Sequence, residues 1–103
     1  MEINRKKLMY SILRELNNNS NIDYTGKTFE VDDQVFEQTI EILIDEQMVR
    51  GFKIARFIDG SSDIQINNPR ITLKGIEFLE ENNEWKKLYK GLKEIKSWLP
   101  FMN

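Results

Sequence analysis

Residues 31–51, VDDQVFEQTIEILIDEQMVRG, have the pattern of an amphipathic helix followed by the start of a strand. The apolar residues recur at helical spacing: Phe36, Ile40, Leu43 and Ile44, with Met48 continuing the stripe. Asp32 or Asp33 can cap the first turn, where the helix dipole favours a carboxylate. The stretch therefore predicts a helix over residues 32–48. A helix that leads into a strand in this way has the position of the reading helix of a DNA-binding domain.

The residues before this helix predict one further helix and a loop. Leu8, Ile12, Leu13 and Leu16 form an apolar stripe, which predicts a helix over residues 4–16. The NNNSN run at 17–21 ends that helix, because asparagine tolerates left-handed backbone and competes for helical hydrogen bonds. Residues 22–31 have no helical period, so we expect a loop with at most one short turn or strand.

The residues after the central helix predict a β-hairpin. Residues 49–58 are rich in β-forming residues, and IQI at 64–66 alternates as a return strand. Between them, IDGSSD at 58–63 has the composition of a hairpin tip built around Asp59-Gly60. We therefore predict a wing hairpin over residues 49–67. Pro69 should lie at an edge, since proline cannot donate to a central ladder.

Two helices are predicted at the end of the chain, over residues 72–82 and 84–98. Thr72 is a suitable N-cap for the first, and Gly75 within it suggests close packing against another element. Its expected inward residues are Leu73, Ile76 and Leu79. The second helix has apolar residues at intervals of three and four: Trp85, Leu88, Leu92, Ile95 and Leu99.

The order helix, loop, helix, hairpin, helix, helix predicts a single α+β domain over residues 1–103, mainly α. Helices followed by a two-stranded hairpin that folds back on them describe a winged helix-turn-helix-like domain with a two-stranded wing and an extra C-terminal helix. The second helix of that motif is abbreviated or missing, because residues 22–31 must take its place. A chain of 103 residues has no room for a second independent core.

The composition excludes most kinds of active site. The 103 residues contain no cysteine and no histidine, which removes thiol nucleophiles, Ser-His-Asp systems and zinc sites with His or Cys ligands. Glycine-rich phosphate-binding motifs are absent as well. We therefore predict no enzyme activity, no catalytic residue, no cofactor and no metal. Cysteine-free composition and the lack of a long apolar run lead us to expect a cytoplasmic protein without a membrane partner.

Three stretches carry a family resemblance: KLMYSILREL near the start, VDDQVFEQTIEILIDEQMVRG in the middle, and ITLKGIEFLEENNEWKKLYKGLKEIKSWLPF at the end. Together they resemble the YjcQ family, small winged-helix-like proteins of Gram-positive bacteria and their prophages. The last stretch is the most specific, and the three cover about two-thirds of the chain. The resemblance implies a winged-helix fold and a phage or mobile-element context. It implies no catalytic residue.

The central helix is strongly acidic. Residues 32–48 contain six acidic residues and no lysine or arginine. The residues expected to face outward are Gln34, Glu37, Gln38, Glu41 and Asp45. Glutamine and carboxylates can read base edges, but carboxylates oppose the phosphate contacts that supply most of the affinity for DNA. A solvated acidic surface is the ordinary explanation, and docking of a basic protein partner is the alternative.

Positive charge is concentrated in the wing and at the chain ends. If nucleic acid is bound, its phosphates should contact five of these side chains: Lys53, Arg56, Lys86, Lys90 and Lys93. The alternatives are that the wing strands only cover the core and that the terminal lysines only form a solubilising surface. Lys86, Lys90 and Lys93 would form a stripe on the final helix, beside Arg5, Lys6 and Lys7 of the first. The opposite, apolar side of the final helix can pack on the first helix, or can pair with a second copy as a homodimer.

These patterns support two hypotheses about function. The first is a phage-associated regulator or accessory factor that binds nucleic acid, which rests on analogy of fold. The second is a protein–protein interaction module that works without DNA, through the acidic helix or through homodimer formation by the C-terminal helix. The acidic surface could also imitate nucleic acid and occupy the basic groove of another protein.

Overall fold

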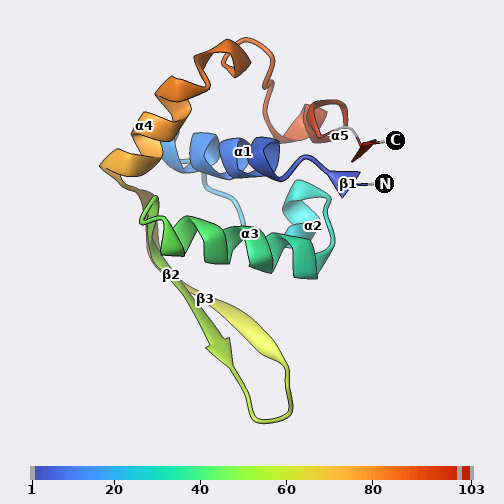
Figure 1. The fold of residues 1–103 in the computed structure, drawn as a ribbon, viewed down its shortest axis with the longest axis vertical. Helices are drawn as coiled ribbons and strands as arrows, with labels where there is room; N and C mark the ends of the chain where they lie inside the picture. The colour runs from blue at the N-terminus through green and yellow to red at the C-terminus, as the bar shows by residue number, and fades with distance from the viewer. Residues whose placement is uncertain (1, 100, 103) are drawn as a thin grey trace.

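The computed structural model describes residues 2–99 and 101–102, with side chains for residues 4–99 (Figure 1). Its helices are α1 (Arg5–Asn17), α2 (Gly26–Phe29), α3 (Asp33–Asp45), α4 (Leu73–Glu81) and α5 (Ile95–Trp98), with 3-10 turns η1 (Asn83–Trp85) and η2 (Leu92–Glu94). Its strands are β1 (Glu2–Ile3), β2 (Val49–Arg56), β3 (Ser62–Ile71) and β4 (Phe101–Met102). β2 pairs antiparallel with β3, and β1 with β4.

The predicted α+β fold, mainly α, is confirmed. α1 lies beside α3, and the β2–β3 hairpin extends away from the helical layers as a long arm (Figure 1). Helices followed by a two-stranded antiparallel hairpin are compatible with a winged helix. Most of the largest fully buried apolar side chains come from the first three helices, and Ile95 of α5 joins them: Tyr10, Leu8, Ile12, Leu13, Phe29, Phe36, Ile40, Leu43 and Ile95.

Between α1 and α3, where a winged helix-turn-helix motif would have its second helix, the structure has the four-residue α2. The Thr25 side chain caps it by accepting from the backbone N–H of Thr28 at 3.2 Å. Glu30 ends it in the left-handed region, at φ 57°. A Cβ atom on Gly26 would lie 2.8 Å from the Val31 carbonyl oxygen, so the chain turns back tightly toward α3. The loop expected over residues 22–31 therefore contains the abbreviated helix.

The hairpin is longer than predicted because β3 continues to Ile71. A bulge interrupts the pairing: Arg50 lies opposite Arg70, but Phe52 lies opposite Ile66. In the bulge Gly51 of β2 lies opposite the extra residues of β3, and its own backbone has φ +86°. A Cβ on Gly51 would lie 2.6 Å from the carbonyl oxygens of Asn67 and Asn68. Pro69 falls inside the bulge, where no ladder hydrogen bond is required of it.

α4 begins where the sequence predicts, but one of the three side chains expected to face inward does not. The Thr72 side chain accepts from the Gly75 N–H at 3.2 Å, which confirms the cap. A Cβ on Gly75 would lie 2.5 Å from the Met48 carbonyl oxygen, which confirms the close packing. Leu73, however, is 71% exposed, because α4 turns Gly75, Phe78 and Leu79 toward the core instead.

The helix predicted over residues 84–98 is wrong. The structure has the turn η1, a non-helical stretch, the turn η2 and only four residues of α-helix in α5. Gly91 lies at φ +91°, which no right-handed helix accommodates. The chain therefore bends back around α1 in short pieces, and Leu88 is 59% exposed instead of packed inward.

Aromatic side chains fasten this C-terminal segment, residues 83–99, to α1. Tyr10 of α1 meets the Trp85, Tyr89 and Trp98 rings at centroid distances of 5.5, 6.2 and 5.7 Å. The Trp98 Nε1–H donates to the Ser11 hydroxyl at 2.5 Å. The apolar side chains expected to be available for a dimer seam are thus packed mostly within the same chain.

Candidate nucleic-acid interface

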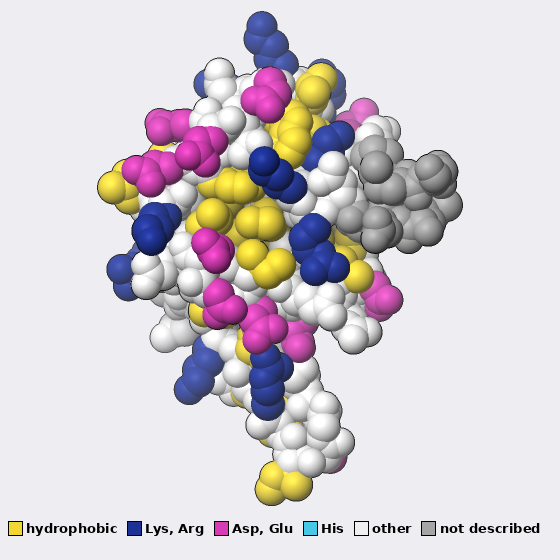
Figure 2. Space-filling view, in the orientation of Figure 1, with side chains coloured by type: hydrophobic (Ala, Val, Ile, Leu, Met, Phe, Trp, Pro, Cys, Tyr) yellow, Lys and Arg dark blue, Asp and Glu magenta, His cyan; other side chains and the backbone are white. Residues whose placement is uncertain are grey.

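The outward side of α3 is acidic, as expected, but two of its carboxylates have partners. Gln34, Gln38 and Asp45 are exposed, whereas Glu37 and Glu41 are half-buried. Figure 2 shows acidic side chains gathered over α3 at the root of the hairpin, with basic side chains just below them.

Arg56 connects the hairpin to α3. Its Nη2 donates to Glu41 Oε2 at 2.5 Å, and its Nη1 lies 3.8 Å from Glu37 Oε2. Ser62, opposite Arg56 in β3, donates its hydroxyl to Glu37 Oε1 at 2.5 Å. We call these four residues the wing clasp. Arg56, one of the expected phosphate contacts, therefore points toward the acidic helix.

Strand alternation explains this orientation. Phe52 is buried and Ile54 half-buried toward α3, so Arg56 follows on the same side of β2. Lys53 is exposed on the opposite side, level with Gln65 of β3. The two expected wing contacts thus lie on different faces of one strand.

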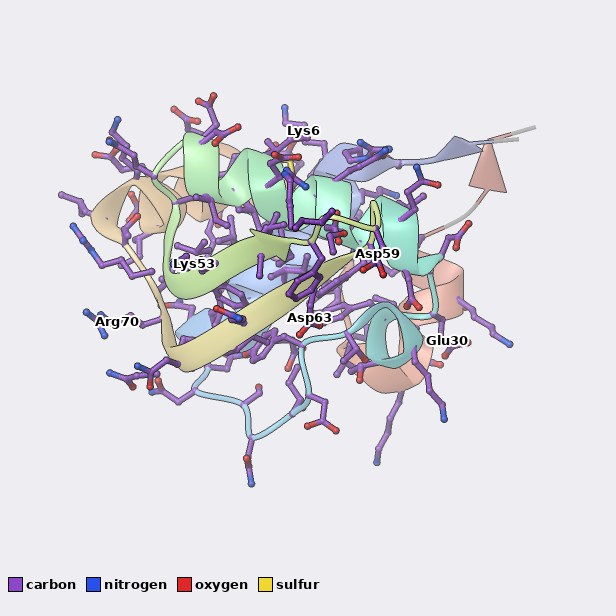
Figure 3. All side chains as sticks on the ribbon, turned by 90° about the horizontal axis from the view of Figure 1, so that it is seen from below. Lys6, Glu30, Lys53, Asp59, Asp63 and Arg70 are labelled. Carbon is purple, nitrogen blue, oxygen red and sulfur yellow. The ribbon has the colours of Figure 1, made fainter. Side chains whose placement is uncertain are left out.

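The solvent side of the hairpin near its base is basic. Arg50 lies directly opposite Arg70 across the ladder, and both are exposed. Their chain neighbours Val49 and Ile71 are turned toward the core, so the two guanidinium groups share the outer face with Lys53. We call Arg50, Lys53 and Arg70 the hairpin-base surface. Figure 3 places Lys53 and Arg70 toward the base, and Asp59 and Asp63 toward the tip.

No residue of the hairpin-base surface forms a salt bridge with a carboxylate in the part of the chain that the structure describes. Arg50 is absent from the wing contacts expected from the sequence, which were Lys53 and Arg56. Its position opposite Arg70 depends on the bulge at Gly51, and residue types alone do not reveal that register.

The expected lysine stripe is not formed, because the helix that would carry it is broken. Lys86 lines a hollow of about 250 Å³ with Arg14 of α1. Lys90 lines another of about 320 Å³ with Lys7. Lys93 is exposed in η2. The C-terminal segment lies on the side of α1 away from the hairpin (Figure 1), so these lysines and the wing do not form one surface.

A buried polar cluster lies between α1 and the C-terminal segment. Glu15 is 7% exposed, and its carboxylate accepts from the Tyr89 hydroxyl at 2.5 Å and the Ser20 hydroxyl at 2.6 Å. Burial, followed by the hydrogen bond to Glu15, raises the pKa of Tyr89 well above its ordinary value. Burial and the nearby Glu15 charge also raise the pKa of Tyr24 to about 12. Through these hydrogen bonds Glu15 joins Ser20 and Tyr89 to α1.

Within residues 2–99 and 101–102, no cluster of three acidic side chains is arranged to hold a metal ion. In the same residues, no helix combines the length and the apolar character needed to cross a bilayer.

A family model described as "YjcQ protein" matches residues 6–98. The chain is 31% identical over 97 residues to the "Uncharacterized protein YjcQ" of Bacillus subtilis (strain 168), covering 94% of this chain and 99% of that protein. No solved structure matches the chain. Both the family model and the relative span nearly the whole fold described above, and the chain therefore belongs to the YjcQ family.

Proposed function

We propose that this protein binds double-stranded DNA through the hairpin-base surface, as a small regulator or accessory factor. The observation that carries the proposal is the cross-strand pair Arg50–Arg70, with Lys53 on the same outer face. Like charges placed directly opposite in a ladder destabilise a sheet. A ligand that carries closely spaced negative charges, such as a phosphate backbone, relieves that repulsion.

The geometry of the base suits such a contact. Val49 is buried in the core, and the Thr72 backbone N–H donates to the Met48 carbonyl oxygen at 3.0 Å, so both strands are held where they meet the helices. Guanidinium groups presented by a held backbone lose less freedom on binding than groups on a mobile loop. Arginine also binds phosphate in a bidentate manner.

In the proposed complex α3 does not enter a DNA groove. Glu37 and Glu41 occupy its hairpin side together with Arg56, and Asp45 adds a further carboxylate. Placing these groups beside phosphates would oppose binding. We therefore expect contacts mainly with the backbone, little base reading and weak sequence preference.

Fluorescence anisotropy with a labelled duplex, titrated at several salt concentrations, tests the proposal. Each phosphate contact contributes about −0.9 to the slope of log K against log salt concentration. The double variant Arg50→Gln/Arg70→Gln should lower the slope magnitude by about 2 and weaken binding to duplexes of any sequence.

Lys86→Gln/Lys90→Gln is the matched control, because it removes the same charge at the other end of the molecule. Absence of binding at low salt would refute the proposal, and equal losses in the two double variants would show only a general charge effect. Tighter binding to a single-stranded DNA or RNA probe would show that this nucleic acid, and not duplex DNA, is the ligand.

A further inference from the structure

The tip of the hairpin exposes large apolar side chains without a partner. Phe57 is 51% exposed and Ile58 is fully exposed, and both follow Arg56 at the end of β2. Isolated apolar residues are common on surfaces, whereas contiguous exposed apolar surface rimmed by polar residues marks interaction sites. Neither residue belongs to the hairpin-base surface.

Phe57 lines a groove between the hairpin and the first half of α3. Its outer part, about 570 Å³, is bounded by Asp33 and Glu37 on the α3 side and by Arg56 and Phe57 on the hairpin side. Its inner part, about 290 Å³, shares Asp33 and Glu37 and reaches Asp63, Ile64 and Tyr24. We call the two parts together the wing groove.

The groove is apolar at both ends and acidic in the middle. Asp33 and Glu37 supply two carboxylates, and Arg56 supplies one cation that the wing clasp already neutralises. Asp33 forms no salt bridge within residues 2–99 and 101–102. A ligand that fills the groove must therefore carry positive charge next to apolar surface.

We propose that the wing groove and the hairpin tip dock a basic segment of a partner protein, with an arginine side chain lying against Phe57. A guanidinium group can stack on an aromatic ring and bind a carboxylate at the same time, and Phe57 and Asp33 line the same hollow. Lysine matches this arrangement less well, because its ammonium group is a compact and strongly hydrated point charge. Charge complementarity makes DNA an unsuitable occupant of this groove.

This proposal is independent of DNA binding, because the groove and the hairpin-base surface lie on different faces of the hairpin. Phe52, Ile54 and Arg56 face α3, whereas Lys53 faces solvent. A partner in the groove and a duplex at the base could therefore be bound at once, and variants can separate the two functions.

The test uses the full chain and a labelled nine-residue peptide with three arginines separated by leucine and glycine. A second peptide with citrulline in place of arginine keeps the shape and loses the charge. The arginine peptide should bind at low salt, with amide chemical-shift changes concentrated in residues 33–37 and 56–64. Phe57→Ala should weaken binding about two- to fivefold, the range of an exposed cation–π contact. Asp33→Asn should also weaken it, and the citrulline peptide should not bind.

Matched controls are available on exposed sites elsewhere. Leu73→Ala removes an exposed apolar side chain, and Glu77→Gln removes an exposed carboxylate, both on α4. Neither should change peptide affinity, and Arg50→Gln/Arg70→Gln should not weaken it.

Five outcomes would overturn the proposal. Four concern affinity: no binding of the arginine peptide, equal binding of the citrulline peptide, equal losses in the control variants, and a loss of duplex affinity in Phe57→Ala. A dimer seen by light scattering and lost in Phe57→Ala would also overturn it, because the occupant would then be a second copy.

Discussion

The Tyr89 hydroxyl donates a 2.5 Å hydrogen bond to Glu15 Oε2, which joins the C-terminal segment to α1 across 74 sequence positions. Ser20 satisfies the other carboxylate oxygen of Glu15 at 2.6 Å. The Arg14 guanidinium lies 5.7 Å from the centroid of the Tyr89 ring and adds a cation–π contact at the same junction. The segment is therefore attached by specific polar contacts as well as by aromatic packing.

Replacing Tyr89 by phenylalanine should lower the free energy of unfolding by about 1–3 kcal/mol, because a buried carboxylate oxygen loses its donor. Urea unfolding followed by tryptophan fluorescence measures this directly. Leu88→Ala, an exposed neighbour, is the control and should change stability by less than about 0.5 kcal/mol. A Tyr89→Phe variant as stable as the unchanged protein would contradict the proposed role of this hydrogen bond.

Stability should fall as the pH rises above about 10, the ordinary tyrosine pKa. The folded state raises the pKa of Tyr24 to about 12 and that of Tyr89 further, so the unfolded chain loses these protons first. Fewer protons on the unfolded state mean that the free energy of unfolding decreases with pH in this window.

Urea midpoints between pH 8 and pH 11 should show a decline, and the double variant Tyr24→Phe/Tyr89→Phe should flatten it. The same decline in the double variant would assign the effect to lysines instead.

Alanine at Gly75 should destabilise the fold by about 1–3 kcal/mol, the usual cost of overpacking. The new Cβ would lie 2.5 Å from the Met48 carbonyl oxygen and 2.5 Å from Ile71 Cγ1, so α4 would have to move away from the hairpin base. Glu77→Ala, exposed on the same helix, controls for helix propensity. Thermal unfolding should give a lower midpoint for Gly75→Ala than for Glu77→Ala. Equal midpoints would show that the structure accommodates the new Cβ without a loss of stability.

Glutamine at Arg56 should cost less than about 1 kcal/mol of stability, because its salt bridges are exposed to solvent. Amide exchange in residues 56–62 should become faster as the hairpin separates from α3. Duplex affinity and its salt dependence should stay unchanged, in contrast to Arg50→Gln/Arg70→Gln. A salt slope reduced by about 1 would instead assign a phosphate contact to Arg56, as first expected from the sequence.

Local signals in the sequence were sufficient for much of the fold. Thr72 and Gly75 were interpreted correctly, because a cap and a close approach depend on residues near in the chain. The apolar stripe of α3 likewise predicted its buried side, with Phe36, Ile40 and Leu43 in the core.

The C-terminal segment shows where such signals fail. Intervals of three and four between apolar residues are met by a helix, but also by short turns that wrap around another helix. The chain forms turns instead of a helix because Gly91 has a positive φ and because three aromatic rings, Trp85, Tyr89 and Trp98, pack on Tyr10. This packing is long-range, so no periodicity within residues 84–98 could reveal it.

The candidate surfaces were harder to predict than the fold. The sequence showed that α3 is acidic and that the wing carries cations. It did not show that Arg56 pairs with Glu41, which lies 15 positions away. Which wing cations face solvent depends on the register across the bulge, and that register is fixed by Gly51.

The bulge at Gly51 divides the arm into two mechanical parts. Before it, Arg50 and Arg70 belong to a section anchored through Val49 in the core. Beyond it, the distal section is held against α3 through the buried Phe52, the half-buried Ile54 and the exposed Arg56 salt bridges. Because salt screens exposed ion pairs, ionic strength should loosen the distal section while the proximal one stays fixed. We expect Gly51 to act as a hinge between the two sections, so that a protein docked at the tip, as proposed, would leave a duplex at the base undisturbed.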